Sequence, residues 1–285
     1  MLVALSALFL RIISNPCANT LQKKLAEKHS ATLINLYSYA FLSLFVLIPA
    51  TTNNWSGYGY NFGFYVILAG ILCTLGSICL IKALQYGEMS VLAPINSYKC
   101  IVGLIFGFLL LGETPSIVQF LGLILIIFGS RYLFETTPEG FSFKLFKRKD
   151  ILLRILALVF TGCEAVILKK IILISSPLEC FILWCFSGFI FSAILMFSRA
   201  KSLKIFAKKD LFACIGIAIS LGIMQLSTNI VFNYINVGLS LALFQLSSII
   251  AVILGYKMFN EKQIQKKLLG TLIMIIGSCM ILVLK

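Results

Sequence analysis

The sequence predicts an all-α integral membrane protein with ten transmembrane helices, arranged as two inverted five-helix repeats. Three observations predict this fold class: an apolar composition, ten apolar segments of spanning length, and a match of the chain with itself. Of the 285 residues, 60% are hydrophobic and only 12% are charged, and the mean hydropathy is +1.03. A soluble domain has about 25% charged residues, so this composition excludes a soluble enzyme and a disordered chain.

The apolar segments account for nearly the whole chain, because a helix needs about 20 apolar residues to cross a bilayer. The expected spans are 2–21, 32–51, 63–86, 88–111, 116–134, 151–174, 178–198, 211–235, 238–259 and 267–284. The first segment is interpreted as a retained span. No basic region precedes it and no small-residue cleavage site follows it, so the pattern is not that of a signal peptide.

Prolines and acidic residues mark particular points in these segments. Pro94 removes a backbone donor within the fourth segment and predicts a kink there, and Pro16 predicts the same in the first. Glu113 and Glu261 precede the fifth and tenth segments. Because a helix N-terminus favours an acidic side chain, both are predicted to be capping or gate residues rather than ligands.

The chain matches itself when it is shifted by 148 positions. The coinciding residues are Tyr86 with Tyr234, Gly107 with Gly255, Glu113 with Glu261, Gly122 with Gly270, and Gly129 with Gly277. This match predicts a first repeat over 1–134, a basic linker over 135–150 and a second repeat over 151–285. An odd number of spans in each repeat gives the two repeats opposite orientations, which is a common transporter architecture.

The end of each repeat resembles the EamA-type repeat of the drug/metabolite transporter superfamily. The features that carry the resemblance in the first repeat are Pro94, the Leu-Gly-Glu sequence at 111–113, Gln119, Gly122 and Gly129. The second copy keeps Gly238, Glu261, Gly270 and Gly277, but has Asn260 before the glutamate and Ala242 at the position of Pro94. The resemblance implies a secondary transporter that works by alternating access around a cavity between its repeats. It implies little about the substrate.

The net charge of +14 is concentrated on one side of the predicted membrane, which we call the basic face. Its cations are Lys23, Lys24, Lys28, Lys144, Lys147, Arg148, Lys149, Arg199, Lys201, Lys204, Lys208, Lys209, Lys262, Lys266 and Lys267. This pattern indicates topology and contact with lipid headgroups rather than nucleic-acid binding. The positive-inside rule places the basic face in the cytoplasm and both termini outside, whereas the resemblance implies cytoplasmic termini, so the orientation stays open. We expect a multi-pass protein of a bacterial inner (plasma) membrane.

Charged side chains inside spans are candidates for function, because each costs about 2.5–3.5 kcal/mol on insertion scales. The predicted substrate-binding residues are Arg11, Asn15, Asn96, Lys99, Glu164, Gln225, Asn229 and Gln245. Arg11 and Lys99 would donate to a phosphate or carboxylate, and Glu164 would bind an amine or a coupling cation. In the alternative, Glu164 pairs with Arg11 or Lys99 and only holds helices together, and the amides bridge helices.

Other polar and aromatic residues have simpler interpretations. Arg154 and Lys169 lie near helix ends, where a long side chain reaches the membrane surface, and Trp184 is expected at a span end. The nine cysteines are expected to be small packing residues. With one histidine and no CxxC sequence, neither a metal site nor a cofactor is expected.

The predicted function is transport of a small polar metabolite, with an anionic or zwitterionic cargo slightly favoured by the surplus of buried cations. A flippase for a lipid or lipid-linked sugar is the alternative, and a membrane transferase is a remote one because the chain has only two aspartates, Asp150 and Asp210. The expected partners are a small-molecule substrate and membrane lipids, with no nucleic acid, in a monomer or homodimer.

Overall fold

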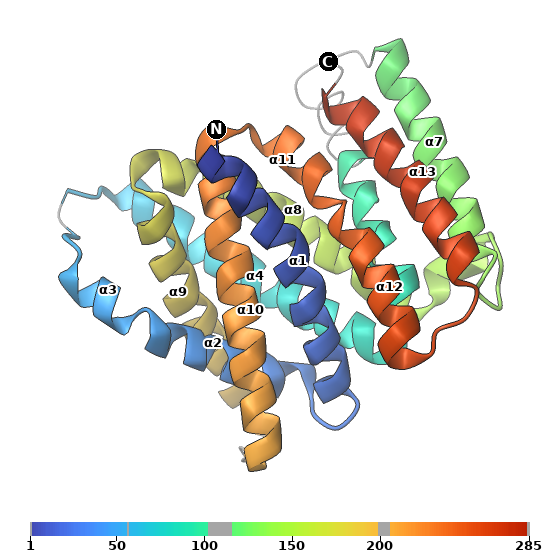
Figure 1. Ribbon diagram of the computed structural model, residues 1–285. Helices are drawn as coiled ribbons and strands as arrows, with labels where there is room; N and C mark the ends of the chain where they lie inside the picture. The colour runs from blue at the N-terminus through green and yellow to red at the C-terminus, as the bar shows by residue number, and fades with distance from the viewer. Residues whose placement is uncertain (1, 56, 102–115, 199–205, 284–285) are drawn as a thin grey trace.

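A computed structural model describes residues 2–55, 57–101, 116–198 and 206–283, and all regular structure in these residues is helical (Figure 1). The elements are α1 Leu2–Ala26, α2 Ala31–Phe45, α3 Leu47–Thr52, α4 Tyr60–Tyr86, α5 Met89–Leu92, the 3₁₀ helix η1 Pro94–Ser97, α7 Ile117–Phe134, the 3₁₀ helix η2 Phe143–Lys147, α8 Lys149–Ile174, α9 Pro177–Phe197, α10 Lys208–Tyr234, α11 Val237–Phe244, α12 Ser247–Phe259 and α13 Ile264–Val283.

Eight stretches within the described residues are long and apolar enough to cross a membrane: α1, α4, α7, α8, α9, α10, α13 and the continuous run of α11 and α12. The all-α membrane class is therefore confirmed. The second expected span is shorter than predicted, because the helix breaks at Val46 between α2 and α3. The fourth expected span begins with α5 and η1, and its later part, with Gly103 and Gly107, lies outside the described residues.

Polar residues in the connections begin several helices, as expected for side chains that can accept from an unpaired backbone N–H. Ser116 and Gln119 form a reciprocal capping box at the start of α7, and Asn236 caps α11 by accepting from Leu239 N at 2.7 Å. Glu261 caps a helix too, but the prediction was wrong about which one. Instead of α13, it caps α5. Glu113 lies outside the described residues.

The fourth expected span is broken at its proline. The α-helix ends at Leu92 and the backbone tightens to the 3₁₀ helix η1 at Pro94, because proline cannot donate the bond that would continue the ladder. The corresponding span of the second half breaks between α11 and α12 without a proline. Pro16, in contrast, lies inside the uninterrupted helix α1.

The main helix pairs join the two halves of the chain reciprocally. In the order of predicted spans, the first packs on the eighth (α1 with α10) and the third on the sixth (α4 with α8). The second packs on the seventh (α2 with α9) and the fifth on the tenth (α7 with α13), the pair seen together in Figure 1. If the first five spans are exchanged with the last five, the same set of helix pairs results. A two-fold symmetry axis that relates the two predicted repeats produces this pattern.

Glycines bring α7 and α13 into close contact, as expected for glycines in membrane helix interfaces. A Cβ atom at Gly122 would lie 2.6 Å from the carbonyl oxygen of Gly277, and one at Gly129 would lie 2.8 Å from that of Gly270. The two helices therefore meet backbone to backbone over two helical turns.

Candidate functional site

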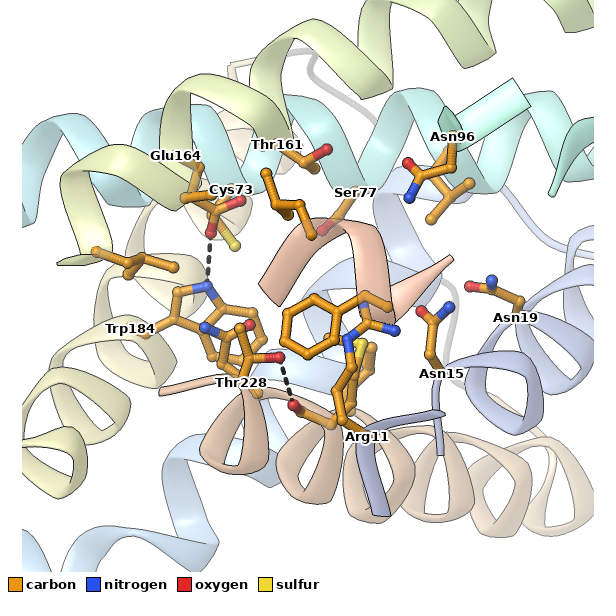
Figure 2. A pocket seen from close by; sticks show the side chains of 18 of the residues that line it. Arg11, Asn15, Asn19, Cys73, Ser77, Asn96, Thr161, Glu164, Trp184 and Thr228 are labelled. Carbon is orange, nitrogen blue, oxygen red and sulfur yellow. Dashed lines mark hydrogen bonds between the residues drawn. The ribbon is translucent and has the colours of Figure 1, made fainter. Parts of the chain in front are cut away.

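A polar cavity of about 140 Å³ lies between the two halves of the chain (Figure 2). Six of the eight predicted site residues line it: Arg11, Asn15, Asn96, Lys99, Glu164 and Gln225. They come from α1, η1, the segment that follows η1, α8 and α10. The cavity thus combines side chains that are far apart in the sequence.

Arg11 lies midway along α1 and has almost no polar partner. Its Nε and Nη1 atoms are buried and make no hydrogen bond within the described residues. The guanidinium carbon lies 4.2 Å from the centre of the Phe244 ring, which attracts the cation through the face of its π-system. Asn15 and Asn19 follow at helical spacing on the same face of α1 (Figure 2).

Glu164 of α8 is 7% exposed and accepts a hydrogen bond of 2.8 Å from the indole Nε1 of Trp184 (Figure 2). No ion pair joins Glu164 to Arg11 or Lys99 in the described residues, so the direct pairing considered as an alternative is not formed. The prediction for Trp184 was wrong, since this residue lies near the middle of α9 and is 4% exposed. Its N–H is needed inside the cavity wall, where it satisfies a buried carboxylate.

Arg154 of α8 also lines the cavity, which corrects its prediction as a surface-reaching residue near a helix end. It is 8% exposed, and its Nε donates to the carbonyl oxygen of Leu92 at 2.8 Å. That carbonyl has no partner in its own helix, because Asn96 N bonds to Ala93 in the 3₁₀ turn instead. The break at Pro94 therefore creates the acceptor that positions Arg154.

Lys99 is partly exposed in the cavity and has no hydrogen bond or ion pair with any described residue. Together with Arg11 and Arg154 it gives the cavity three cationic side chains, against the single carboxylate of Glu164. Such an arrangement attracts an anion and can bind a carboxylate or phosphate through charge-assisted hydrogen bonds.

Two predicted residues, Asn229 and Gln245, do not line the cavity but hold its walls. Asn229 accepts from Gln225 Nε2 at 3.0 Å and donates to the carbonyl oxygen of Pro177 at 3.1 Å. Gln245 lies at the break between α11 and α12 and exchanges bonds with Asn96: it accepts from Nδ2 at 3.3 Å and donates to the carbonyl oxygen at 3.4 Å. The two broken spans thus touch at their breaks.

Sequence reasoning passed over several polar lining residues because each is unremarkable inside an apolar run. They are Asn19, Gln22, Tyr39, Ser77, Thr161 and Thr228. Within the described residues there is no group of three metal-ligating side chains that could hold an ion. All nine cysteines are free thiols, and Cys73 is one that lines the cavity.

A polar cavity enclosed by the spans of two related halves defines a class of protein, the multi-pass membrane transporter. The chain belongs to the EamA-like transporter family, whose model matches residues 4–134 and 148–283. This is a family of transporters and not of enzymes, and the chain is accordingly a multi-pass integral membrane protein.

Two further similarities are more limited. The chain is 34% identical over 65 residues to an uncharacterised protein of Methanocaldococcus jannaschii, and this alignment covers 23% of the chain and 47% of that protein. A solved crystal structure matches with a TM-score of 0.69 at 13% identity, covering 99% of this chain and 96% of that one. The similarity to the crystal structure supports the fold alone.

Proposed function

We propose that the protein transports a small anionic or zwitterionic metabolite by alternating access around the cavity between its repeats, 1–134 and 151–285, which the linker 135–150 joins. The observation that carries the proposal is the charge of the cavity. Among the described residues, three cations and one carboxylate line it. None of the three cations forms an ion pair with a described residue, and only Arg154 is held by a backbone carbonyl oxygen, that of Leu92.

A bound anion would resolve an unfavourable feature of this cavity. Burying a cation without a partner is costly, because the protein does not replace the hydrogen bonds that water provided. The carboxylate or phosphate of a cargo molecule would supply acceptors to Arg11 and Lys99. Glu164, held by Trp184, is available to an ammonium group, which is why a zwitterion also fits.

The size of the cavity favours a small cargo. Its volume is about 140 Å³, close to the roughly 150 Å³ cavity that accommodates benzene. We therefore expect an amino acid, a small carboxylate or a small phosphate ester rather than a nucleotide sugar.

The proposal is tested by uptake and binding in proteoliposomes with a panel of phosphorylated, carboxylated and amine metabolites. Lys99→Gln should weaken binding of the identified cargo about tenfold or more, the value of one charge-assisted hydrogen bond. Lys257→Gln is the matched control, because Lys257 is exposed near the end of α12. Equal binding by both variants would contradict the assignment. Glu164→Gln should weaken zwitterions and not simple anions.

The alternative of a flippase has one observation in its favour. An apolar groove of about 460 Å³, lined by residues of η1, α7, η2 and α8, includes Ile95 and Tyr98, the neighbours of cavity residues Asn96 and Lys99. It could accept an acyl chain while a headgroup occupies the cavity. Binding of a lipid-linked precursor, with no binding across the metabolite panel, would favour this function. The inner-membrane location and the monomeric or homodimeric state stay predictions.

A further inference from the structure

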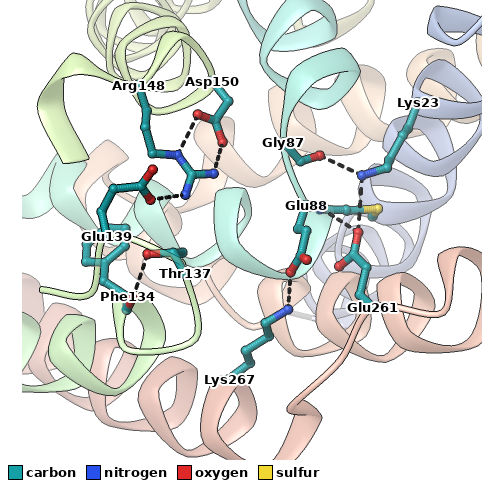
Figure 3. A network of polar contacts seen from close by, with 11 residues as sticks. Lys23, Gly87, Glu88, Phe134, Thr137, Glu139, Arg148, Asp150, Glu261 and Lys267 are labelled. Carbon is teal, nitrogen blue, oxygen red and sulfur yellow. Dashed lines mark hydrogen bonds and ion pairs between the residues drawn. The ribbon is translucent and has the colours of Figure 1, made fainter. Parts of the chain in front are cut away.

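Five side chains form a network at the basic face, and we call it the Glu261 network (Figure 3). Its members are Lys23, Glu88, Ser90, Glu261 and Lys267. The first three belong to the first half of the chain, and the last two to the second half. Each ionic contact in the network therefore joins the two halves.

Glu261 is the centre of the network and is 6% exposed. One carboxylate oxygen accepts from Met89 N at 2.8 Å and from Lys23 Nζ at 3.1 Å, and the other accepts from Ser90 N at 2.9 Å. Gly255 leaves room for this carboxylate, because a Cβ there would lie 2.5 Å from Oε2. The acid is thus fully coordinated by the opposite half of the protein.

Lys267 adds a second ionic connection beside the first. Its ammonium pairs with Glu88 (Figure 3) and donates to Ser90 Oγ at 2.8 Å. Lys23 in turn donates to the carbonyl oxygen of Gly87 at 2.6 Å. Both lysines therefore bind the chain where α4 ends and α5 begins.

The network lies at one end of the cavity. Gln22, the residue before Lys23, still lines the cavity, and so does Arg154, which binds the last residue of α5. A cargo molecule that left toward the basic face would have to pass between α1, α5 and the loop that carries Glu261. These are the elements that the network ties together.

We propose that the Glu261 network is the gate of the cavity on the basic face, closed in this structure and opened when the halves separate there during transport. This inference rests on the proposed alternating-access function. Ionic contacts suit a gate at a membrane surface, because opening exchanges protein partners for water at small net cost. The ion pair Arg131–Glu135 lies on the same side, but it joins two neighbouring positions at the end of α7 and not the two halves, so it has no such role.

The gate can be tested without knowing the cargo. Cys73 lines the cavity and is 2% exposed, whereas Cys185 is 0% exposed in the apolar core and does not line the cavity. A membrane-impermeant maleimide is added from the basic face of sealed vesicles, and each cysteine is followed by peptide mass spectrometry. Glu261→Gln should raise the labelling rate of Cys73 about tenfold or more and leave Cys185 unlabelled.

The matched control is Glu135→Gln, the same substitution in an exposed ion pair on the same side, which should change neither rate. Unchanged labelling of Cys73 in Glu261→Gln would overturn the proposal. So would parallel labelling of Cys185, since this would show that Glu261 stabilises the whole fold rather than one gate.

A second variant tests the closed state directly. This variant combines Lys23→Cys with Glu261→Cys, and a bifunctional thiol cross-linker matched to the length of the original pair joins the two cysteines. The cross-link should lower Cys73 labelling from the basic face at least tenfold below wild type. An unchanged rate would show that cargo access does not pass this point. Neither result depends on whether the cargo is an anion, so failure of the cargo assignment is recognised separately.

Discussion

Replacing Gly129 by alanine tests whether the close contact between α7 and α13 stabilises the fold. A Cβ at this position would lie 2.8 Å from the carbonyl oxygen of Gly270, 2.8 Å from Met274 Cγ and 3.0 Å from Met274 N. Unstrained contacts between carbon atoms are about 3.5–4.0 Å. Because two of the three neighbours are backbone atoms, the clash can be relieved only if the helices move apart.

The expected magnitude follows from two opposing effects. Overpacking a tight interface costs about 1–3 kcal/mol, while alanine favours the helix over glycine by about 0.8–1.0 kcal/mol. Gly162→Ala isolates the second effect, because nothing lies within 4 Å of a Cβ at Gly162 in α8. We therefore expect Gly129→Ala to be less stable than Gly162→Ala by about 1–3 kcal/mol.

The measurement is the free energy of unfolding of both variants in the same detergent, by reversible denaturant titration. A stability for Gly129→Ala equal to or above that of Gly162→Ala would refute the reasoning. It would mean that the two helices separate without cost and that their contact is not a fixed part of the fold.

Three further predictions concern the cavity, the gate and the orientation. Trp184→Phe removes the donor to Glu164 while keeping an aromatic ring. We expect it to weaken binding of a zwitterionic cargo in proteoliposomes about tenfold, which is the effect of one hydrogen bond to a charged group. Unchanged affinity would contradict this expectation. Burial alone would raise the pKa of Glu261, but hydrogen bonds from Ser90 and Met89 and the charge of Lys23 hold it below its ordinary value of 4.5. The stabilisation is then present above the ordinary pKa and is lost only as the pH falls through the lower folded value. Because maleimide reacts with the thiolate, whose fraction rises with pH, the rate of Cys73 labelling from the basic face is divided by that of a free thiol in the same buffer. This ratio should stay flat between about pH 5 and 8, and a rise within that range would exclude Glu261 as the controlling group. A reporter fused to the C-terminus should be active outside the cell if the positive-inside rule holds, and cytoplasmic activity would reverse the orientation.

The sequence was sufficient for the fold class because lipid imposes a simple rule on every span. Apolar segments of about 20 residues must be helices there, since their backbone groups have no water to bind. It was also sufficient for the break at Pro94, which follows from a missing donor. The break between α11 and α12 has no proline, and hydropathy does not distinguish a broken apolar helix from a continuous one.

The candidate site was only partly accessible from the sequence. Position along a span gives the depth of a side chain but not the group it meets. Arg154 was assigned to the membrane surface because it lies near a helix end, yet its partner is a carbonyl released by a distant proline. Glu261 was recognised as a capping residue, but the helix that it caps begins 172 residues earlier in the chain. Such pairings arise from the assembly of the two halves and leave no local signal.

In the proposed alternating-access cycle, the two kinds of contact between the halves have different roles. The contact of α7 with α13 is mainly close packing of backbone and apolar side chains, with one hydrogen bond from Gln119 Nε2 to the carbonyl oxygen of Ile281. Separating the two helices in lipid would forfeit this close packing. The Glu261 network has charged groups that water can solvate when they part. Since one pair of surfaces must stay together while another opens, we infer that the halves rock about α7 and α13 and separate at Glu261.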